Sequence, residues 1–96
     1  MAEFGPVRDN EQARRFELEV DGAVAFAAYR QVGDALEMYS TVTPPALRGR
    51  GIASALARAA LDSARERGLK VIPTCWFIDQ FIRDNPDYRD LLAGPG

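Results

Sequence analysis

The sequence contains no histidine and only one cysteine, Cys75. An internal disulfide is therefore excluded, and nothing in the cysteine usage points to secretion. Zinc sites in proteins are built mostly from histidine and cysteine side chains, so the usual zinc sites are excluded as well. We expect a protein without a bound metal, and any base that it uses in catalysis must be something other than an imidazole.

Long apolar runs are also missing. No stretch approaches the ~20 apolar residues that a membrane-spanning helix needs. The first ten residues, MAEFGPVRDN, lack the apolar centre and the cleavage-site pattern of a signal peptide. The formal net charge of −2 gives no general attraction to nucleic acid or to an anionic membrane. We therefore expect a soluble cytoplasmic protein with neither kind of partner.

The composition is that of an ordinary globular protein. A chain of 96 residues, 47% hydrophobic and 27% charged, suits one domain over residues 1–96. Its charges are unevenly placed, because arginines gather around a glycine-rich segment and acidic residues gather near the C-terminal end. The arginines are Arg48, Arg50 and Arg58, and the acidic residues are Asp79, Asp84, Asp87 and Asp90. A local positive patch suits a small anionic ligand better than a polyanion.

The first half of the chain predicts an antiparallel meander of three strands. Apolar and charged residues alternate over 15–20, which is the period-two pattern of a half-buried strand. Asp21-Gly22 follows at once and favours a hairpin turn. A second strand is expected over 23–32 and a third over 35–42. Pro44-Pro45 ends the third strand, because proline cannot donate to a sheet ladder.

The second half predicts a helix, a short strand and a second helix. The first helix starts near Gly51 and closes at Gly68, a typical C-terminal glycine. Residues 69–73 are almost wholly apolar, as in a buried central strand, and the last helix stops before Pro86. Ligands of such sheets bind where strand ends open beside a helix N-terminus. The apolar stripe expected on the first helix comprises Ile52, Ala55, Leu56, Ala59, Ala60 and Ser63.

The order of these elements defines the fold class. A strand, a glycine loop, a helix and a strand form a right-handed crossover over 35–73, with its two strands parallel or splayed apart. The prediction is an α+β fold in which an antiparallel meander leads into a β-loop-α-β crossover and a C-terminal helix. Three residues near the end of the chain are expected to pack back on the sheet, namely Tyr88, Leu91 and Leu92.

The segment Arg48-Gly49-Arg50-Gly51-Ile52-Ala53 is the candidate ligand site. Its glycines permit a close backbone approach, and the first helical turn offers free N–H groups with partial positive charge. The two arginines can donate to phosphate oxygens. A plain strand-to-helix turn with solvated arginines is the alternative. No Gly-Lys-Ser/Thr is present, which excludes a Walker-type loop, and no acidic residue ends the next strand as a Rossmann site requires.

The motif Arg48-x-x-Gly51-x-Ala53 resembles the coenzyme-A loop of the GNAT superfamily of N-acetyltransferases. The run TPPALRGRGIASALARAALDSARERGLKVIPTCWFI resembles a small subfamily of single-domain GNAT-like proteins, and the likeness extends from about Phe16 to Leu92. The resemblance implies a minimal acyl-CoA N-acyltransferase fold, with acetyl-coenzyme A as co-substrate. It implies that backbone groups of the loop hold the pyrophosphate and that the preceding strand edge holds the pantetheine arm. The implied binding residues are Thr41, Val42, Thr43, Arg48, Gly49, Arg50, Gly51, Ile52, Ala53 and Ser54.

Two residues are candidates for the chemistry. Cys75 follows the apolar strand where the thioester would arrive, and the resembled subfamily has a cysteine here that has been considered as an acyl acceptor. A thiol reacts as its thiolate and Trp76 makes the surroundings apolar, so an inert, buried cysteine is the alternative. Glu37 is a candidate base acting through water, as carboxylates on this strand do in relatives. An exposed strand residue without a role is its alternative.

Two departures from the resembled pattern bear on activity. Ser40 stands where the subfamily commonly has a histidine, and Phe81-Ile82 stand where larger enzymes carry a tyrosine acid. We predict an acetyl-coenzyme A-binding protein that moves the acetyl group directly to a small or exposed amine, such as a lysine or a polyamine. The alternatives are a non-catalytic acyl-coenzyme A-binding module and an interaction domain with a vestigial loop, because fold likeness does not fix function. A monomer or weak dimer is expected.

Overall fold

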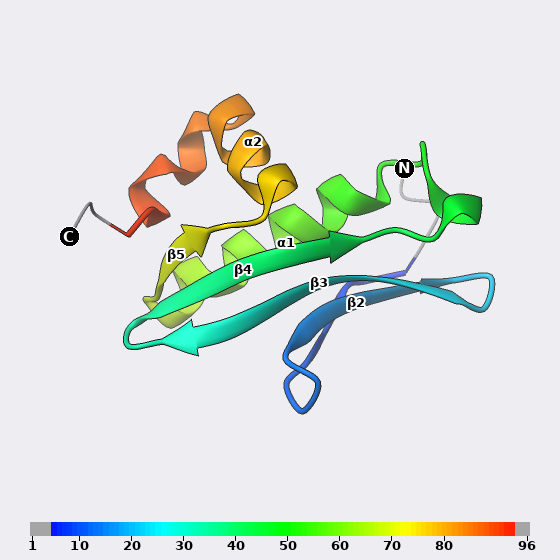
Figure 1. Ribbon diagram of the computed structural model, residues 1–96, viewed down its shortest axis with the longest axis horizontal. Helices are drawn as coiled ribbons and strands as arrows, with labels where there is room; N and C mark the ends of the chain where they lie inside the picture. Colours follow the sequence, from blue (N-terminus) through cyan, green and yellow to red (C-terminus); the bar gives the residue numbers. More distant parts are fainter. Residues whose placement is uncertain (1–4, 94–96) are drawn as a thin grey trace.

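A five-stranded sheet, with strands in the order β1-β2-β3-β4-β5, is the frame of the molecule (Figure 1). The computed structural model describes residues 5–93, so the two ends of the expected domain, 1–4 and 94–96, lie outside the described residues. β1 to β4 form an antiparallel meander, and β5 pairs with β4 in parallel. The predicted three-strand meander, here β2 to β4, and the predicted parallel pairing across the crossover are confirmed. The strands are β1 (Arg8–Asn10), β2 (Arg15–Val20), β3 (Ala23–Val32), β4 (Ala35–Val42) and β5 (Lys70–Pro73).

Two α-helices and two short 3₁₀ segments complete the fold. Helix α1 (Ile52–Arg67) connects β4 to β5, and α2 (Trp76–Asp84) follows β5. The 3₁₀ segments are η1 (Pro45–Leu47), which leads into the glycine loop, and η2 (Pro86–Leu91). Within residues 5–93, no helix has the length and the apolar character needed to cross a membrane.

Glycines in the left-handed region mark both ends of α1. Gly51 at the N-cap has φ 77°, and Gly68 at the C-cap has φ 69°. Residues with a Cβ adopt this conformation only at a cost, so the chain can turn sharply into and out of the helix because these two residues are glycine. The Gly68 N–H donates to the carbonyl of Arg65 at 3.1 Å, which closes the last turn.

Both helices pack on the same face of the sheet. Alternate residues of β2, β3 and β4 join the buried residues of α1 and α2 in one apolar cluster. Figure 1 shows α1 crossing behind the strands and α2 above the end of β5. Among residues 5–93, no helix covers the other face, which we call the open face. The strand residues in the cluster are Phe16, Leu18, Val20, Ala25, Ala27, Tyr29, Leu36, Met38 and, from β5, Val71.

The position of β5 differs from the sequence prediction. Its apolar sequence indicated a central strand, but β5 is the last strand of the sheet. Its outer side is covered by the returning chain, because the Ala93 N–H donates to the Val71 carbonyl at 2.9 Å and Leu92 bridges Val71 in parallel. The predicted packing of the chain end on the sheet is therefore confirmed, and it explains why an edge strand is apolar.

The buried face of α1 is rotated from the predicted stripe. Ala57, Leu61 and Ala64 are fully buried, whereas Ala55, Ala59 and Ser63 of the predicted stripe are only partly covered. The helix contacts α2 and η2 as well as the sheet, so its apolar face is wider than one stripe.

The short strand β1 has no apolar alternation, and the sequence analysis did not predict it. Polar contacts hold it in place instead: the Tyr29 hydroxyl donates to Asp9 at 2.6 Å, and Arg67 at the end of α1 pairs with the same carboxylate. Burial, reinforced by the neighbouring Asp9, raises the pKa of Tyr29 to about 12. The Tyr29 hydroxyl therefore keeps its proton, and the hydrogen bond that it donates to Asp9 holds β1 on the sheet.

Candidate functional site

β4 and β5 separate at Met38. Their pairing runs from Ala35 opposite Lys70 to Met38 opposite Pro73, and the Cys75 N–H then donates to the Met38 carbonyl at 2.9 Å. Beyond this point β4 pairs only with β3. The two strands are therefore parallel up to Met38 and splayed apart beyond it, so each of the two predicted arrangements holds on one part of β4.

A β-bulge coincides with the separation. The β3–β4 register places Tyr29 opposite Met38 but Ala28 opposite Ser40, so Tyr39 is an extra residue in β4. A bulge bends and twists its strand, and this one turns the end of β4 away from β5. The gap between the strands is thus set by the backbone of β4 and lies beside Cys75.

A row of free donors opens α1. The Ala55 N–H bonds to the Gly51 carbonyl at 3.1 Å, but the N–H groups of Ile52, Ala53 and Ser54 find no partner within the described part of the chain. Gly51 supplies no side-chain cap, and the first turn carries no acidic residue. The helix dipole adds partial positive charge at this end, so the first turn is suited to hold an anion.

The glycine loop lines one end of a groove. A pocket of about 240 Å³ at the start of α1 adjoins one of about 270 Å³ at the end of β4, and both are lined by Thr43, Arg48, Ala53 and Phe77. The first is lined also by Leu47, Gly49, Gly51, Ile52 and Ser54, and the second also by Thr41. The groove therefore runs from the free N–H groups of α1 along β4 towards the gap between β4 and β5.

Most of the predicted binding residues meet in this groove. Eight of the ten line it, and the exceptions are Val42 and Arg50. The guanidinium of Arg50 lies 3.7 Å from Asp21 in the β2–β3 turn, whereas Arg48 donates to the Thr43 carbonyl at 3.2 Å and so stiffens the groove wall. Arg58, grouped with the loop in the sequence analysis, points instead to the Tyr88 hydroxyl at 3.5 Å.

Cys75 lies next to Thr41, which lines the groove at the end of β4. It is half-buried at the N-cap of α2, and its Sγ atom lies 3.4 Å from the Thr41 hydroxyl. Within residues 5–93, no carboxylate or cation hydrogen-bonds to the sulfur. A hydroxyl neither removes a thiol proton nor stabilises a thiolate as a cation does, so no side chain within residues 5–93 activates Cys75 as a nucleophile.

Glu37 lies on the open face, beside the gap, and is firmly held. Its side chain is 16% exposed, and it accepts hydrogen bonds from Arg30 Nε and from the Thr74 hydroxyl, both at 2.8 Å. The bond from Arg30, helped by the one from Thr74, lowers the pKa of Glu37. The carboxylate thus stays ionised and is a weaker base than a free glutamate.

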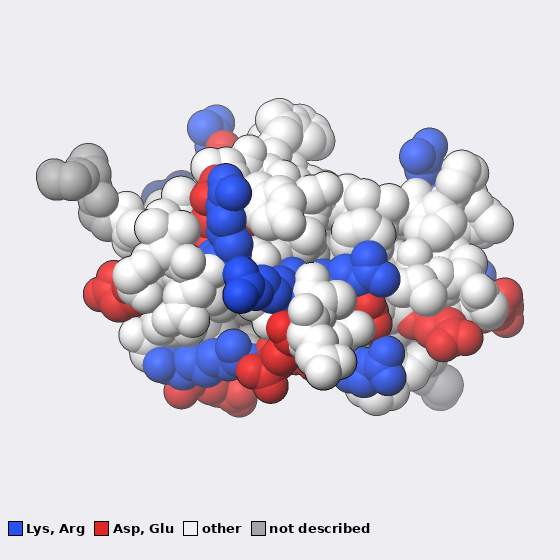
Figure 2. Space-filling view, turned by 60° about the horizontal axis from the view of Figure 1, so that its bottom comes forward, with Lys and Arg blue, Asp and Glu red and all other residues white. Residues whose placement is uncertain are grey.

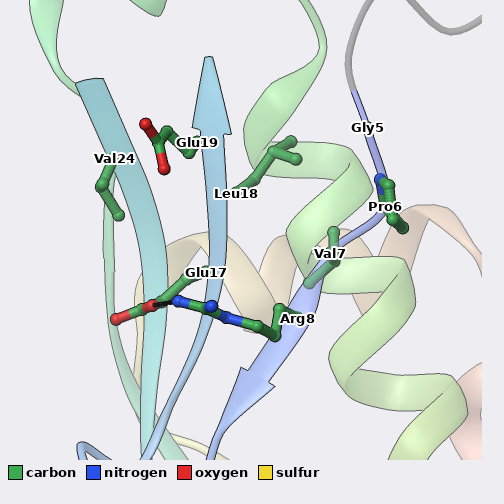
Figure 3. Close-up of a pocket in the computed structure, with 8 residues that line it drawn as sticks. All are labelled: Gly5, Pro6, Val7, Arg8, Glu17, Leu18, Glu19 and Val24. Carbon is green, nitrogen blue, oxygen red and sulfur yellow. Dashed lines mark hydrogen bonds and ion pairs between the residues drawn. The ribbon is translucent and has the colours of Figure 1, made fainter. Parts of the chain in front are cut away.

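The pocket in Figure 3 is larger but chemically different. It measures about 480 Å³ and lies beside β2, where the segment from Gly5 to Val7 runs alongside. Figure 3 shows Arg8 and Glu17 pointing toward one another, and their charged groups are 3.0 Å apart. Arg8 is therefore already paired with Glu17, Glu19 adds a negative charge to the lining, and no helix begins there. No group of three or more potential metal ligands occurs within residues 5–93.

The sequence analysis missed part of the groove. Phe77 and Leu47 form its apolar wall, and neither was among the predicted binding residues, because an apolar side chain in a sequence does not show whether it lines a groove or the core. The bulge at Tyr39 leaves no mark in the sequence at all. The glycines and arginines of the loop were the detectable signal.

Comparisons with known proteins agree with this geometry. A family model described as GCN5-related N-acetyl-transferase matches residues 15–91. The protein NATD1 of Mus musculus is 40% identical over 85% of this chain and 79% of its own length, and NATD1 of Homo sapiens is 39% identical over 83% and 74%.

A solved structure has the same fold. The NMR solution structure of a GCN5-like protein from Staphylococcus aureus superposes with a TM-score of 0.73 and 26% identity, covering 100% of this chain and 94% of that one. The matched region of the family model includes every residue that lines the groove. The chain belongs to the GCN5-related N-acetyltransferase family.

Proposed function

We propose that the protein binds acetyl-coenzyme A in the groove and transfers the acetyl group to an amine. The observation that carries the proposal is the row of free N–H groups from Ile52 to Ser54, which opens into a groove ending where β4 and β5 separate. In this arrangement the pyrophosphate is held by the first turn of α1 and by Arg48. The pantetheine arm follows Thr43 and Thr41, and the thioester reaches the gap beside Cys75.

The transfer that fits these residues is direct. The amine nitrogen attacks the thioester carbonyl, a C–N bond forms, and the C–S bond breaks to release coenzyme A. The proton lost by the nitrogen passes to water, and the departing thiolate is protonated by water. Backbone groups on the edge of β4 beyond Met38 have no partner in β5, and they are available to polarise the carbonyl.

A covalent route through Cys75 has little support. Within residues 5–93 its side chain hydrogen-bonds only to the Thr41 hydroxyl, the chain has no histidine, and Glu37 is engaged on the open face. Without a strong base, the enzyme depends on amine that is already deprotonated. For an acceptor with the ordinary lysine pKa of about 10.4, the rate then climbs with pH through the neutral and mildly alkaline range.

A non-catalytic acyl-coenzyme A-binding module is the second candidate function. It is favoured by one observation, namely that Ser40 and Phe81-Ile82 stand where the resembled enzymes carry a histidine and a tyrosine acid. Calorimetric titration with acetyl-coenzyme A tests binding, and thiol release with a broad set of amines tests transfer. Binding with transfer supports the transferase, binding with no transfer supports the module, and no binding contradicts both.

A further inference from the structure

Four residues from three elements meet on the open face where β4 and β5 separate, and we call them the mouth cluster: Arg30, Glu37, Tyr39 and Thr74. Arg30 Nε and the Thr74 hydroxyl each donate to Glu37 at 2.8 Å. The Arg30 guanidinium also lies over the Tyr39 ring, 5.3 Å from its centre. Thr74 immediately precedes Cys75, and Tyr39 is the bulge residue, so the cluster borders the gap from the side opposite α1.

The two charged groups of the mouth cluster differ in how many of their polar atoms are free to bind a ligand. Both carboxylate oxygens of Glu37 already accept hydrogen bonds within the cluster. Arg30, by contrast, uses only Nε, and its side chain is 60% exposed. Within the described part of the chain, its two terminal nitrogens make no hydrogen bond. The group left to recognise a ligand is therefore a guanidinium edge, whose geometry matches a carboxylate.

The guanidinium is held in a fixed orientation before any ligand arrives. The bond to Glu37 and the stacking on Tyr39 restrict its rotation, which lowers the entropy lost on binding. Figure 2 shows positive and negative side chains intermixed on the face in view, with no broad area of one sign. Recognition at the mouth therefore depends on this one oriented group rather than on a general field.

Exposed aromatic rings flank the same point. Tyr39 is 47% exposed and Trp76 is 76% exposed. They follow Met38 and Cys75, the two residues joined by the last backbone hydrogen bond between the separating segments. Large exposed rings beside a site supply apolar contact with little loss of side-chain entropy.

We propose that the acceptor is a small amine that also carries a carboxylate, of the amino-acid or short-peptide class. The terminal nitrogens of Arg30 bind its carboxylate, and its apolar part lies against Tyr39 and Trp76. This inference rests on the proposed function, because it takes the thioester to reach the gap. A polyamine is disfavoured, since the mouth cluster offers no free carboxylate to a second cation.

The test compares two acceptors that differ at one end. Glycylglycine carries a terminal carboxylate, and glycylglycinamide does not. We expect the wild-type protein to prefer glycylglycine in kcat/KM by about tenfold or more, the effect of one charge-assisted contact. Arg30→Gln is expected to bring the ratio of the two kcat/KM values close to one. Arg30→Lys is expected to give a ratio between those of the wild type and Arg30→Gln. Putrescine, a poor acceptor for the wild type, is expected to improve with Arg30→Gln because Glu37 is then less occupied.

Arg15→Gln is the matched control. Arg15 also lies on the open face, stacks over an aromatic ring (Phe26, 4.4 Å) and pairs with a glutamate (Glu17), but it lies on β2, which is separated from β4 by β3. For Arg15→Gln, the ratio of kcat/KM for glycylglycine to kcat/KM for glycylglycinamide is expected to match that of the wild type. Thermal melts check that all variants fold. Amine acetylation without a preference for glycylglycine, or an equal loss in Arg15→Gln, overturns this inference alone. Coenzyme binding with no acetylation of any amine overturns the proposed transferase and this inference with it.

Discussion

Two glycines at opposite ends of α1 provide a controlled perturbation of the groove. Gly51 and Gly68 have nearly the same backbone conformation, with φ 77° and 69°, and a methyl group added at either would meet no atom within 4 Å. Gly51 lines the groove, whereas Gly68 lies at the far end of the helix and does not. Gly51→Ala and Gly68→Ala therefore impose the same kind of backbone strain but differ in what the new methyl group faces.

The expected magnitudes follow from this geometry. Alanine in the left-handed region costs about 1–2 kcal/mol, and with no steric clash at either site both variants should be destabilised to that extent. For a domain of this size, each kcal/mol lowers Tm by about 4–8 °C. Only the Gly51 methyl group stands between the loop backbone and a bound pyrophosphate. Loss of one charge-assisted hydrogen bond, about 1.5–3 kcal/mol, corresponds to roughly a ten- to hundredfold weaker affinity.

Thermal melts and calorimetric titration with acetyl-coenzyme A measure the two effects separately. We expect similar Tm losses in the two variants and weakened binding in Gly51→Ala alone. Equal affinities in the two folded variants would refute the assignment of the pyrophosphate to this loop. Equally weakened binding of acetyl-coenzyme A in both variants would mean that a loss of helix stability, rather than a change in the groove, lowers the affinity.

Three further outcomes are expected. Cys75→Ala should keep turnover within about tenfold, and mass spectrometry after incubation with acetyl-coenzyme A should find no acetyl group on Cys75; a kinetically competent adduct would establish the covalent route. Arg48→Ala should weaken coenzyme binding more than Arg50→Ala in calorimetry, because Arg48 lines the groove and Arg50 faces Asp21; the reverse order would contradict the groove. The hydrogen bond from Arg15 lowers the pKa of Glu17 below its ordinary 4.5. The ion pair therefore stabilises the fold above pH 4.5, and this stabilisation is lost as the pH falls and Glu17 is protonated. The Tm gap between wild type and Glu17→Gln should therefore narrow below pH 4.5, and a constant gap would argue against the linkage.

The parts of the fold that follow local rules could be predicted from the sequence. The alternation over 15–20 and the Asp21-Gly22 turn determine a hairpin by themselves, and Gly51 and Gly68 bracket a helix because few other residues turn the chain that way. The glycine loop was recognisable for the same reason. Its function depends on backbone N–H groups, and glycines beside a helix start reveal where these are free.

The parts that depend on distant partners could not be predicted. The apolar sequence of β5 looks central, because nothing local shows that Leu92 and Ala93 return to cover its outer side. The bulge at Tyr39 arises from the pairing of β3 with β4, which periodicity within one strand does not reveal. Glu37 appeared to be either a free base or a bystander, because its two donors come from β3 and from the residue after β5.

Amide chemical-shift mapping measures directly whether the first turn of α1 holds the pyrophosphate. A 10.6 kDa chain is well suited to ¹H–¹⁵N spectra recorded during titration with coenzyme A. We expect the largest shifts at the N–H groups of Ile52, Ala53 and Ser54, with pantetheine alone moving Thr41 and Thr43 but leaving that turn unchanged. Saturable shifts centred instead on the pocket beside β2, between Val7 and Glu19, or no shifts in the first turn of α1, would contradict the account.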